Sequence, residues 1–200
     1  MADMKDYSGE FKPDFQFSDL SKEALVRLIE NYQRIFQGLV VLTVQAAQVK
    51  LGKDEGQRVF NEIYRRTMER YAVPLVRDAL NIHADDVISM FKYFQTAPDG
   101  CRGGGMYDFD FTVTSNNDVT YVGKFCQNAS YYEKHGDVDG MNRLCAAGPG
   151  SFEHEAYETI CRAFNPEMKM EWPLLPPRAS KDAPFCQWRF WIEKKAESKD

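Results

Sequence analysis

The chain has 200 residues, of which 44% are hydrophobic and 28% charged, and its formal net charge is -5 at pH 7. This length is enough to bury a core without disulfide bonds, and the composition is that of a globular protein, which disfavours disordered, collagen-like and membrane-spanning classes. Binding to nucleic acid requires a basic stripe that neutralises phosphates. The lysines and arginines are scattered along the chain, so we expect no nucleic-acid partner.

We expect no signal peptide at the start of this sequence. Residues 1–10 do not resemble a signal peptide, because they hold three acidic residues and no apolar region. The longest apolar stretch, 38–44, is far shorter than the roughly 20 residues that a membrane helix needs. The five cysteines are an odd number and do not look like a secreted disulfide framework. We therefore expect a cytoplasmic protein with reduced thiols and no membrane partner.

The first half of the chain is predicted to be helical. Residues 1–20 combine Pro13 with four aromatic side chains, and we expect them to form an extended arm that lies across the core. In residues 21–97, apolar side chains recur at helical spacing. Ser21 is a favourable N-cap, which predicts a first helix over 22–50.

The middle of this first helix has an unusual composition. Residues 39–44 are apolar on all sides, and a helix that is apolar all round is typically a buried one. A second helix is predicted over 55–80, with a kink at Pro74. A third, over 84–94, begins behind an acidic pair that suits the positive end of the helix dipole.

Residues 106–193 are predicted to contain a sheet. A period of two, which marks a half-buried strand, appears where apolar and polar side chains alternate. The apolar members of this strand are Tyr107, Phe109, Phe111 and Val113. The polar run 115–118 predicts a turn, so the next strand, which ends near Cys126, returns as the second half of a hairpin.

The remaining segments complete the sheet. We expect short helices within 131–144, a helix over 152–164, and strands over 168–174 and 185–192. On the last strand, alternation places Cys186, Trp188 and Phe190 on one face, and Gln187, Arg189 and Trp191 on the other.

Taken together, the elements predict one domain over residues 1–200 of the α+β class, in which an N-terminal helical layer packs on a mainly antiparallel sheet. Residues 194–200 mix charges of both signs and are expected to form a solvated tail.

Several polar residues are candidates for chemistry. The glycines at 103–105 precede a strand instead of opening a helix, which favours a flexible connection over a phosphate cradle. The three histidines show no metal-ligand spacing, and His154 is either a base or an exposed residue in the first turn of its helix. Asp108 and Asp110 share one face of a strand. If that face lines a pocket, the two carboxylates would couple and one pKa would rise; if it faces water, they have no role.

The thiols are the more specific signal. Cys126 ends a predicted strand, Cys145 ends a helix and Cys186 lies in the last strand. If they converge, their thiolates suit zinc or another soft metal, or one of them is a nucleophile with a low pKa beside Arg189. The alternative is that all are buried and inert.

The second half of the chain also resembles a known family. Cys126 and Cys145 are followed by the run 164–170, the pair Pro176-Pro177 and the run 185–190, in the order that resembles the L-2-amino-thiazoline-4-carboxylic acid hydrolase-like family and its uncharacterised relatives. A similar closing strand with a cysteine occurs in small-molecule binding domains of the 4-vinyl reductase type.

The chain departs from the hydrolase-like pattern at two places. Residues 181–185 stand where Gly-Asp-Pro usually precedes the last cysteine, and Gln127 stands where a proline often follows the first. For this reason the identity of the substrate does not carry over.

The resemblance implies a hydrolase-like enzyme that cleaves a carbon–nitrogen or carbon–sulfur bond of a small amino-acid-derived or sulfur-containing molecule in a cysteine-lined pocket between helices and sheet. Cys126 or Cys186 would be the nucleophile, Asp110 or His154 would move protons, and Cys126, Cys145 and Cys186 would hold any zinc or other thiolate-bound metal. The alternative is a non-catalytic sensor or accessory domain that binds a small molecule or a metal. A third hypothesis is an interaction subunit that uses the arm and Trp191, and a homo-oligomer is compatible with each of the three.

Overall fold

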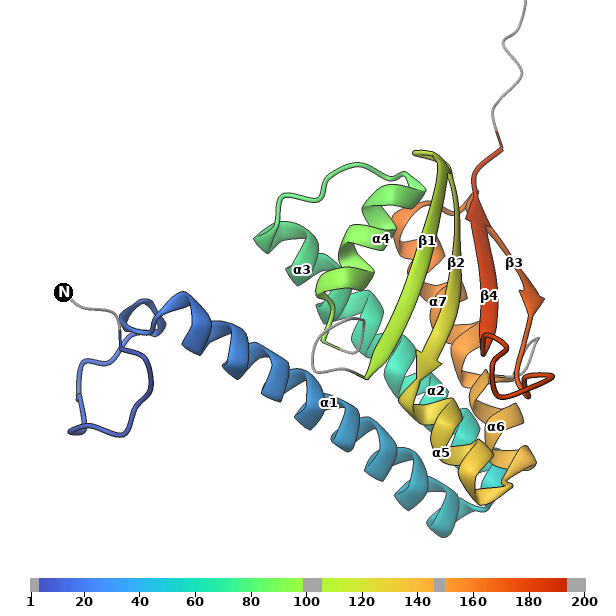
Figure 1. The fold of residues 1–200 in the computed structure, drawn as a ribbon, viewed down its shortest axis with the longest axis horizontal. Helices are drawn as coiled ribbons and strands as arrows, with labels where there is room; N and C mark the ends of the chain where they lie inside the picture. The colour runs from blue at the N-terminus through green and yellow to red at the C-terminus, as the bar shows by residue number, and fades with distance from the viewer. Residues whose placement is uncertain (1–3, 99–105, 146–149, 194–200) are drawn as a thin grey trace, which may run out of the picture.

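A computed structural model describes residues 4–98, 106–145 and 150–193. It shows an α+β architecture in which helices come first and a four-stranded antiparallel sheet follows with further helices interspersed (Figure 1). The helices are α1 (Lys22–Leu51), α2 (Lys53–Thr67), α3 (Val73–Ala79), α4 (Val87–Thr96), α5 (Gln127–His135), α6 (Val138–Cys145) and α7 (Phe152–Phe164), with a 3-10 turn η1 (Phe17–Asp19) and a π-helical turn η2 (Met68–Ala72). The strands are β1 (Tyr107–Ser115), β2 (Asp118–Cys126), β3 (Lys169–Leu174) and β4 (Cys186–Trp191). The predicted fold class is confirmed.

The sheet has the order β1-β2-β4-β3, and every neighbouring pair is antiparallel. The predicted hairpin is β1 and β2, in which Phe111 lies opposite Tyr121. Tyr121 in turn lies opposite Trp188 of β4. Burial alternates along β4, so one face of the sheet packs on helices, as the period of two predicts.

The opposite face of the sheet is polar. On it, the Arg189 guanidinium forms ion pairs with Asp118, at 2.8 Å, and with Glu171, at 3.2 Å. The hydrogen bonds from Arg189 hold the pKa of the Asp118 carboxyl below its usual value. Trp191 lies beside Arg189 on this face and is only partly exposed, with the guanidinium carbon 5.0 Å from the centre of its ring.

The hydrophobic core lies between the sheet and the helices α2, α4 and α7. Trp188 and Phe190 of β4 are fully buried, as is Tyr93 of α4. The ring of Phe91 contacts Phe190 edge-on at 5.5 Å, which brings α4 against the inner face of the sheet. Such aromatic pairs add about 0.5–1.5 kcal/mol to the free energy gained by burial alone.

Helix α1 begins and ends as predicted but is not buried as predicted. Its N-cap Ser21 accepts a hydrogen bond from the Ala24 amide at 3.2 Å. Val40 and Val44 pack against the core, whereas Leu39 and Leu42 on the other side are 62% and 65% exposed. The expectation that 39–44 is buried all round is therefore wrong, because one side of this helix has no neighbour among the described residues.

A glycine brings α1 and α2 together. A Cβ atom at Gly56 would overlap the backbone of Gln48, so no larger residue fits this crossing without a shift of one helix. The Gln48 amide side chain also donates to Gln57 at 3.1 Å. The two helices thus meet at the C-terminal end of α1, and its first turns extend away from the body of the molecule (Figure 1).

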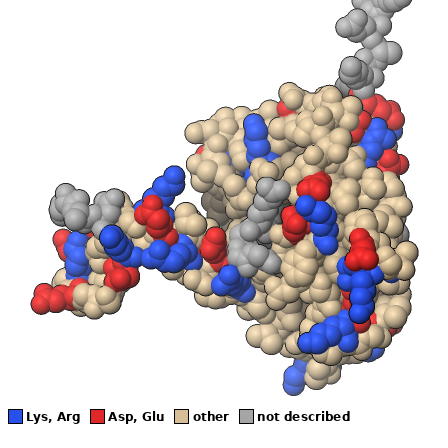
Figure 2. All heavy atoms as spheres, viewed as in Figure 1, with Lys and Arg blue, Asp and Glu red and all other residues tan. Residues whose placement is uncertain are grey.

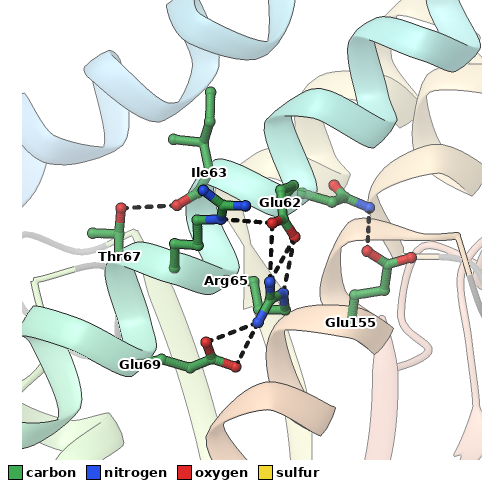
Figure 3. Close-up of polar contacts among 8 residues, drawn as sticks. Glu62, Ile63, Arg65, Thr67, Glu69 and Glu155 are labelled. Atoms are coloured by element: carbon green, nitrogen blue, oxygen red, sulfur yellow. Dashed lines mark hydrogen bonds and ion pairs between the residues drawn. The ribbon is translucent and has the colours of Figure 1, made fainter.

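The predicted second helix over 55–80 is divided into α2, η2 and α3. Pro74 has no N–H to donate to the carbonyl one turn earlier, and the π-helical turn lies at this position. Arg65 of α2 binds Glu62 on the same helix and Glu69 on η2 (Figure 3). The Asn61 amide of α2 donates a hydrogen bond of 2.8 Å to Glu155 of α7, which is labelled in Figure 3, and this bond ties the two helices together.

Two boundaries in the first half differ from expectation. Helix α4 begins at Val87, later than predicted, because the Asp86 carboxylate is its N-cap and accepts from the Ser89 amide at 2.7 Å. The arm does not lie across the core: Phe11 and Phe17 are 82% and 60% exposed. Its described part contacts the start of α1 instead, through a bond from Arg27 to the Lys5 carbonyl.

The visible surface carries lysine, arginine, aspartate and glutamate intermixed, with no large patch of one sign (Figure 2). Among the described helices, none is both long and apolar enough to cross a membrane. The glycine run at 103–105 and the tail at 194–200 lie outside the described residues.

Candidate functional site

A cavity of about 540 Å³ lies between α1 and the inner face of the sheet. Helices α2, α5, α6 and α7 also contribute to its wall. The volume lies within the roughly 300–1,000 Å³ that is typical of small-molecule sites. This is the place between the helical layer and the sheet where the sequence predicts a pocket.

Aromatic side chains form a large part of the wall. Phe109 and Phe111 of β1 and Tyr121 of β2 face inward, and the rings of Phe109 and Tyr121 are 5.0 Å apart. On the helical side, Phe152 packs edge-on against Tyr64 at 4.7 Å. Such a wall suits an apolar molecule with a planar group.

The rim of the cavity carries charged side chains of both signs, which form ion pairs with one another. Lys53 binds Asp139 at 2.8 Å, and Arg143 binds Asp54 at 2.7 Å. Arg143 also contacts Asp139, at 3.3 Å. Since Lys53 and Arg143 each have a carboxylate partner, the described residues of this rim offer no free positive charge to an anionic ligand.

Glu153 is the most unusual polar group in the cavity wall. It lies in the first turn of α7, on the cavity side, and keeps some accessible surface because it faces the empty space. Burial among apolar atoms raises the pKa of its carboxyl from 4.5 to about 7, and a hydrogen bond with the Cys145 thiol opposes part of this rise. No lysine or arginine among the described residues forms an ion pair with it. At neutral pH this carboxyl is therefore about half ionised, and no cation in the described part of the chain pairs with it.

Two tyrosines form the back of the cavity. The hydroxyl groups of Tyr121, from β2, and Tyr157, from α7, are 2.6 Å apart. Burial raises the pKa of both phenols well above 10, so both stay protonated at neutral pH. They can offer one hydrogen-bond donor to a ligand while the other O–H stays within the pair.

The structure brings the three predicted cysteines to the same region. Cys126 and Cys186 line the cavity, and the Cys145 thiol hydrogen-bonds to Glu153 beside it. Burial raises the pKa of Cys126 to about 12 and that of Cys145 and Cys186 well above the usual thiol value. All three are thus protonated thiols at neutral pH, whereas a cysteine nucleophile reacts as the thiolate.

The metal-binding prediction for Cys126, Cys145 and Cys186 gains no support. Across residues 4–98, 106–145 and 150–193, no three histidine, cysteine, aspartate or glutamate side chains are grouped closely enough to hold a metal ion. Cys126 already accepts a hydrogen bond from the Ala129 amide at 3.4 Å, as the N-cap of α5. The fourth described cysteine, Cys161, points elsewhere, toward Met90 at 3.7 Å.

Asp110 does not lie at the cavity. With Asp108 it projects from the exposed face of β1, where the Lys124 ammonium is 3.0 Å from Asp110 and 3.4 Å from Asp108. Because β1 turns alternate residues to opposite faces, its phenylalanines enter the cavity and its aspartates enter the solvent. Of the two readings that the sequence allows, the solvent-facing one is correct.

His154 is also separated from the cavity, although it follows Glu153 directly. It is buried, not exposed, and meets the ring of Trp172 edge-on at 4.7 Å. Its Nδ1 atom has no hydrogen-bond partner among the described residues. Neither proton-transfer candidate, Asp110 nor His154, therefore shares a site with the thiols.

The sequence does contain a signal for Glu153 and Tyr157. Together with Ala156 and Ile160, they recur at the three- and four-residue spacing of one helix face. A carboxylate on an otherwise apolar face is a mark of a functional site. The candidate that the sequence suggests, His154, lies on the side of α7 that does not face the cavity.

Comparison of the chain with protein-family models, with curated proteins and with solved structures gives no significant match.

Proposed function

We propose that this protein is a small-molecule-binding domain whose cavity takes an apolar, preferably aromatic, molecule bearing a protonated amine. The observation that supports this most directly is the Glu153 carboxyl, which has a pKa of about 7 in a wall that is rich in aromatic side chains. An ammonium group bound beside it would balance the buried charge and lower its pKa.

The aromatic wall favours the same ligand. A cation within about 6 Å of an aromatic ring centre gains about 0.5–2 kcal/mol, the larger value when water is excluded. Phe109, Tyr121 and Phe152 surround the space that Glu153 faces. An anionic ligand would instead meet a carboxylate and a rim whose cations are already paired.

A second candidate function is a hydrolase-like enzyme in which Glu153, and not a cysteine, carries out the chemistry. A carboxyl with a pKa near 7 suits general acid–base catalysis at neutral pH, so Glu153 would move the proton. A thiol nucleophile is disfavoured, because Cys126 has a pKa of about 12. Turnover of a small amide or thiazoline that is lost in Glu153→Gln and kept in Cys126→Ser would favour this candidate over simple binding.

The binding proposal is tested by calorimetric titration with two probes of equal size, 2-phenylethylamine and 2-phenylethanol, at pH 6 and pH 8. Ionisation of a group with a pKa of about 7 rises about tenfold between these values, from roughly 9% to roughly 91%. We expect the affinity for the amine to rise by up to about tenfold, whereas the affinity for the alcohol should change little.

Two variants identify the group responsible. Glu153→Gln should abolish the preference for the amine and its dependence on pH. Glu158→Gln, on the exposed side of the same helix and paired with Arg162, is the matched control and should behave as the wild type. Equal binding of amine and alcohol by the wild type at pH 8 would contradict the proposal.

A further inference from the structure

The outward side of α1 carries a continuous apolar seam. It is defined by Leu25, Leu28, Tyr32, Ile35, Leu39, Leu42, Ala46 and Val49. These positions alternate at spacings of three and four, which are the a and d positions of a heptad sustained over the whole helix. Tyr32, Ile35, Leu39, Leu42 and Val49 are each more than half exposed, with Val49 reaching 84%.

The spacing specifies the shape of what covers the seam. A stripe with alternating spacings of three and four drifts slowly around a straight helix. It stays in contact with a partner along its whole length when two helices coil around each other, with knobs from one helix entering holes on the other. At 1.5 Å per residue, the stretch from Leu25 to Val49 is about 36 Å long. The partner must therefore present a helix of similar length, and α1 is the one described helix that long.

The charge pattern requires an uncharged partner surface. The positions that flank the seam between Leu25 and Val49 are Ile29, Asn31, Phe36, Gly38, Thr43 and Gln45, none of which is charged. A partner with lysines or glutamates there would leave charges buried without a counterion. A membrane surface is also disfavoured, because helices that lie on membranes carry lysine and arginine on the opposite face, whereas the opposite face of α1 packs on this protein's core.

Gly38 supports the approach of a second chain. Glycine inside a helix costs about 0.5–1 kcal/mol relative to alanine. No described residue requires it here, because a Cβ atom at Gly38 would meet nothing within 4 Å among residues 4–98, 106–145 and 150–193. A surface that comes from outside and packs closely at mid-helix accounts for the missing side chain.

We propose that this protein forms a two-fold homodimer in which the α1 helices of two copies pair antiparallel along this seam. Antiparallel pairing centred between Ile35 and Leu39 matches every a position with a d position: Leu25 with Val49, Leu28 with Ala46, Tyr32 with Leu42, and Ile35 with Leu39 of the other copy. In this register the two Gly38 residues lie near the axis. The first turns of α1 extend away from the rest of the molecule in Figure 1. In the dimer they would lie along the C-terminal half of the other copy's α1, which packs on that copy's core.

The test begins with the mass of the purified full chain by sedimentation equilibrium. The wild type should be dimeric. Leu42→Glu should raise the dissociation constant at least about a hundredfold, because each dimer would bury two unpaired carboxylates. The matched control is Val26→Glu, an equally simple change at a half-exposed valine of α1 outside the seam, and it should leave the dimer intact.

The Gly38→Leu variant separates loss of the dimer from loss of the folded chain. Its side chain enters open space in the single chain, so circular dichroism and the melting temperature of the monomer should not fall, whereas dimerisation should weaken. A wild type that stays monomeric at all concentrations, or a Leu42→Glu variant as dimeric as the wild type, would overturn the proposal.

Orientation is tested by disulfide formation in a Cys101→Ser background, where the four remaining cysteines are buried. Leu25→Cys and Val49→Cys proteins should crosslink when mixed and not when oxidised separately, because antiparallel pairing places position 25 beside position 49. Crosslinking of each variant with itself would show parallel pairing and overturn the antiparallel arrangement.

Discussion

The free energy of unfolding should record the ionisation of Glu153. Its pKa of about 7 in the folded chain exceeds the 4.5 of a free glutamate, so between these pH values the folded state holds a proton that the unfolded state releases. Stability therefore falls as pH rises through this window and stays lower above it. The full shift corresponds to about 3 kcal/mol.

Replacement of Glu153 with glutamine should remove this penalty. We expect Glu153→Gln to be more stable than the wild type by about 1–3 kcal/mol at pH 8, and by little or nothing at pH 4, where both side chains are neutral. Urea denaturation at the two pH values measures the difference. Glu158→Gln should show no such dependence, and a Glu153→Gln variant that is equally destabilised at both values would contradict the assignment.

At the level of single residues, the sequence predicts less than the structure reveals. The gathering of Cys126, Cys145 and Cys186 could be expected from their placement at the ends of strands and helices. Their ionisation state could not, because a thiol's pKa depends on the apolar atoms that other segments bring around it. Likewise, tertiary packing decides which side of α7 faces the cavity, and it places Glu153, not His154, in the cavity wall.

At the level of elements, periodicity predicts β1, β2, β4 and α7 well, since alternation and helical spacing are local properties of the chain. For α1 it predicts a helix but not its environment. A run that is apolar all round indicates that two sides need covering, and the structure shows that the protein's own core covers only one of them.

The crossing of α1 and α2 can be tested at Gly56. An alanine there would overlap the Gln48 backbone, so the helices must separate, and overpacking of this kind typically costs about 1–3 kcal/mol. Because α1 forms one wall of the cavity, affinity for 2-phenylethylamine should fall as well. Urea denaturation and titration of Gly56→Ala measure both effects. Wild-type stability in this variant would show that the close approach is not essential.

At the level of the whole molecule, the two proposals meet on one helix. Val40 and Val44 of α1 line the cavity, and Leu39 and Leu42 belong to the outward seam. A ligand that holds α1 against the sheet would hold the seam in the conformation that pairs, and by thermodynamic linkage dimerisation would then strengthen ligand binding equally.

Sedimentation with and without saturating 2-phenylethylamine tests this coupling. We expect the amine to tighten the wild-type dimer about fivefold or more, the lower end of typical coupling between sites. Glu153→Gln, which is expected to lose its preference for the amine, should show a smaller effect. Identical dimer affinities with and without the amine would show that cavity and seam act independently.

The edge strands of the sheet also limit how this protein can associate. The outermost strands are β1 and β3, whose free edges would otherwise invite another chain to add a strand. Pro173 removes a backbone donor from β3, the register shifts near it, and β1 has two further irregularities and charged aspartates beside its edge. These features disfavour strand addition and amyloid-like stacking at the sheet edges, whereas pairing through helices does not involve these edges.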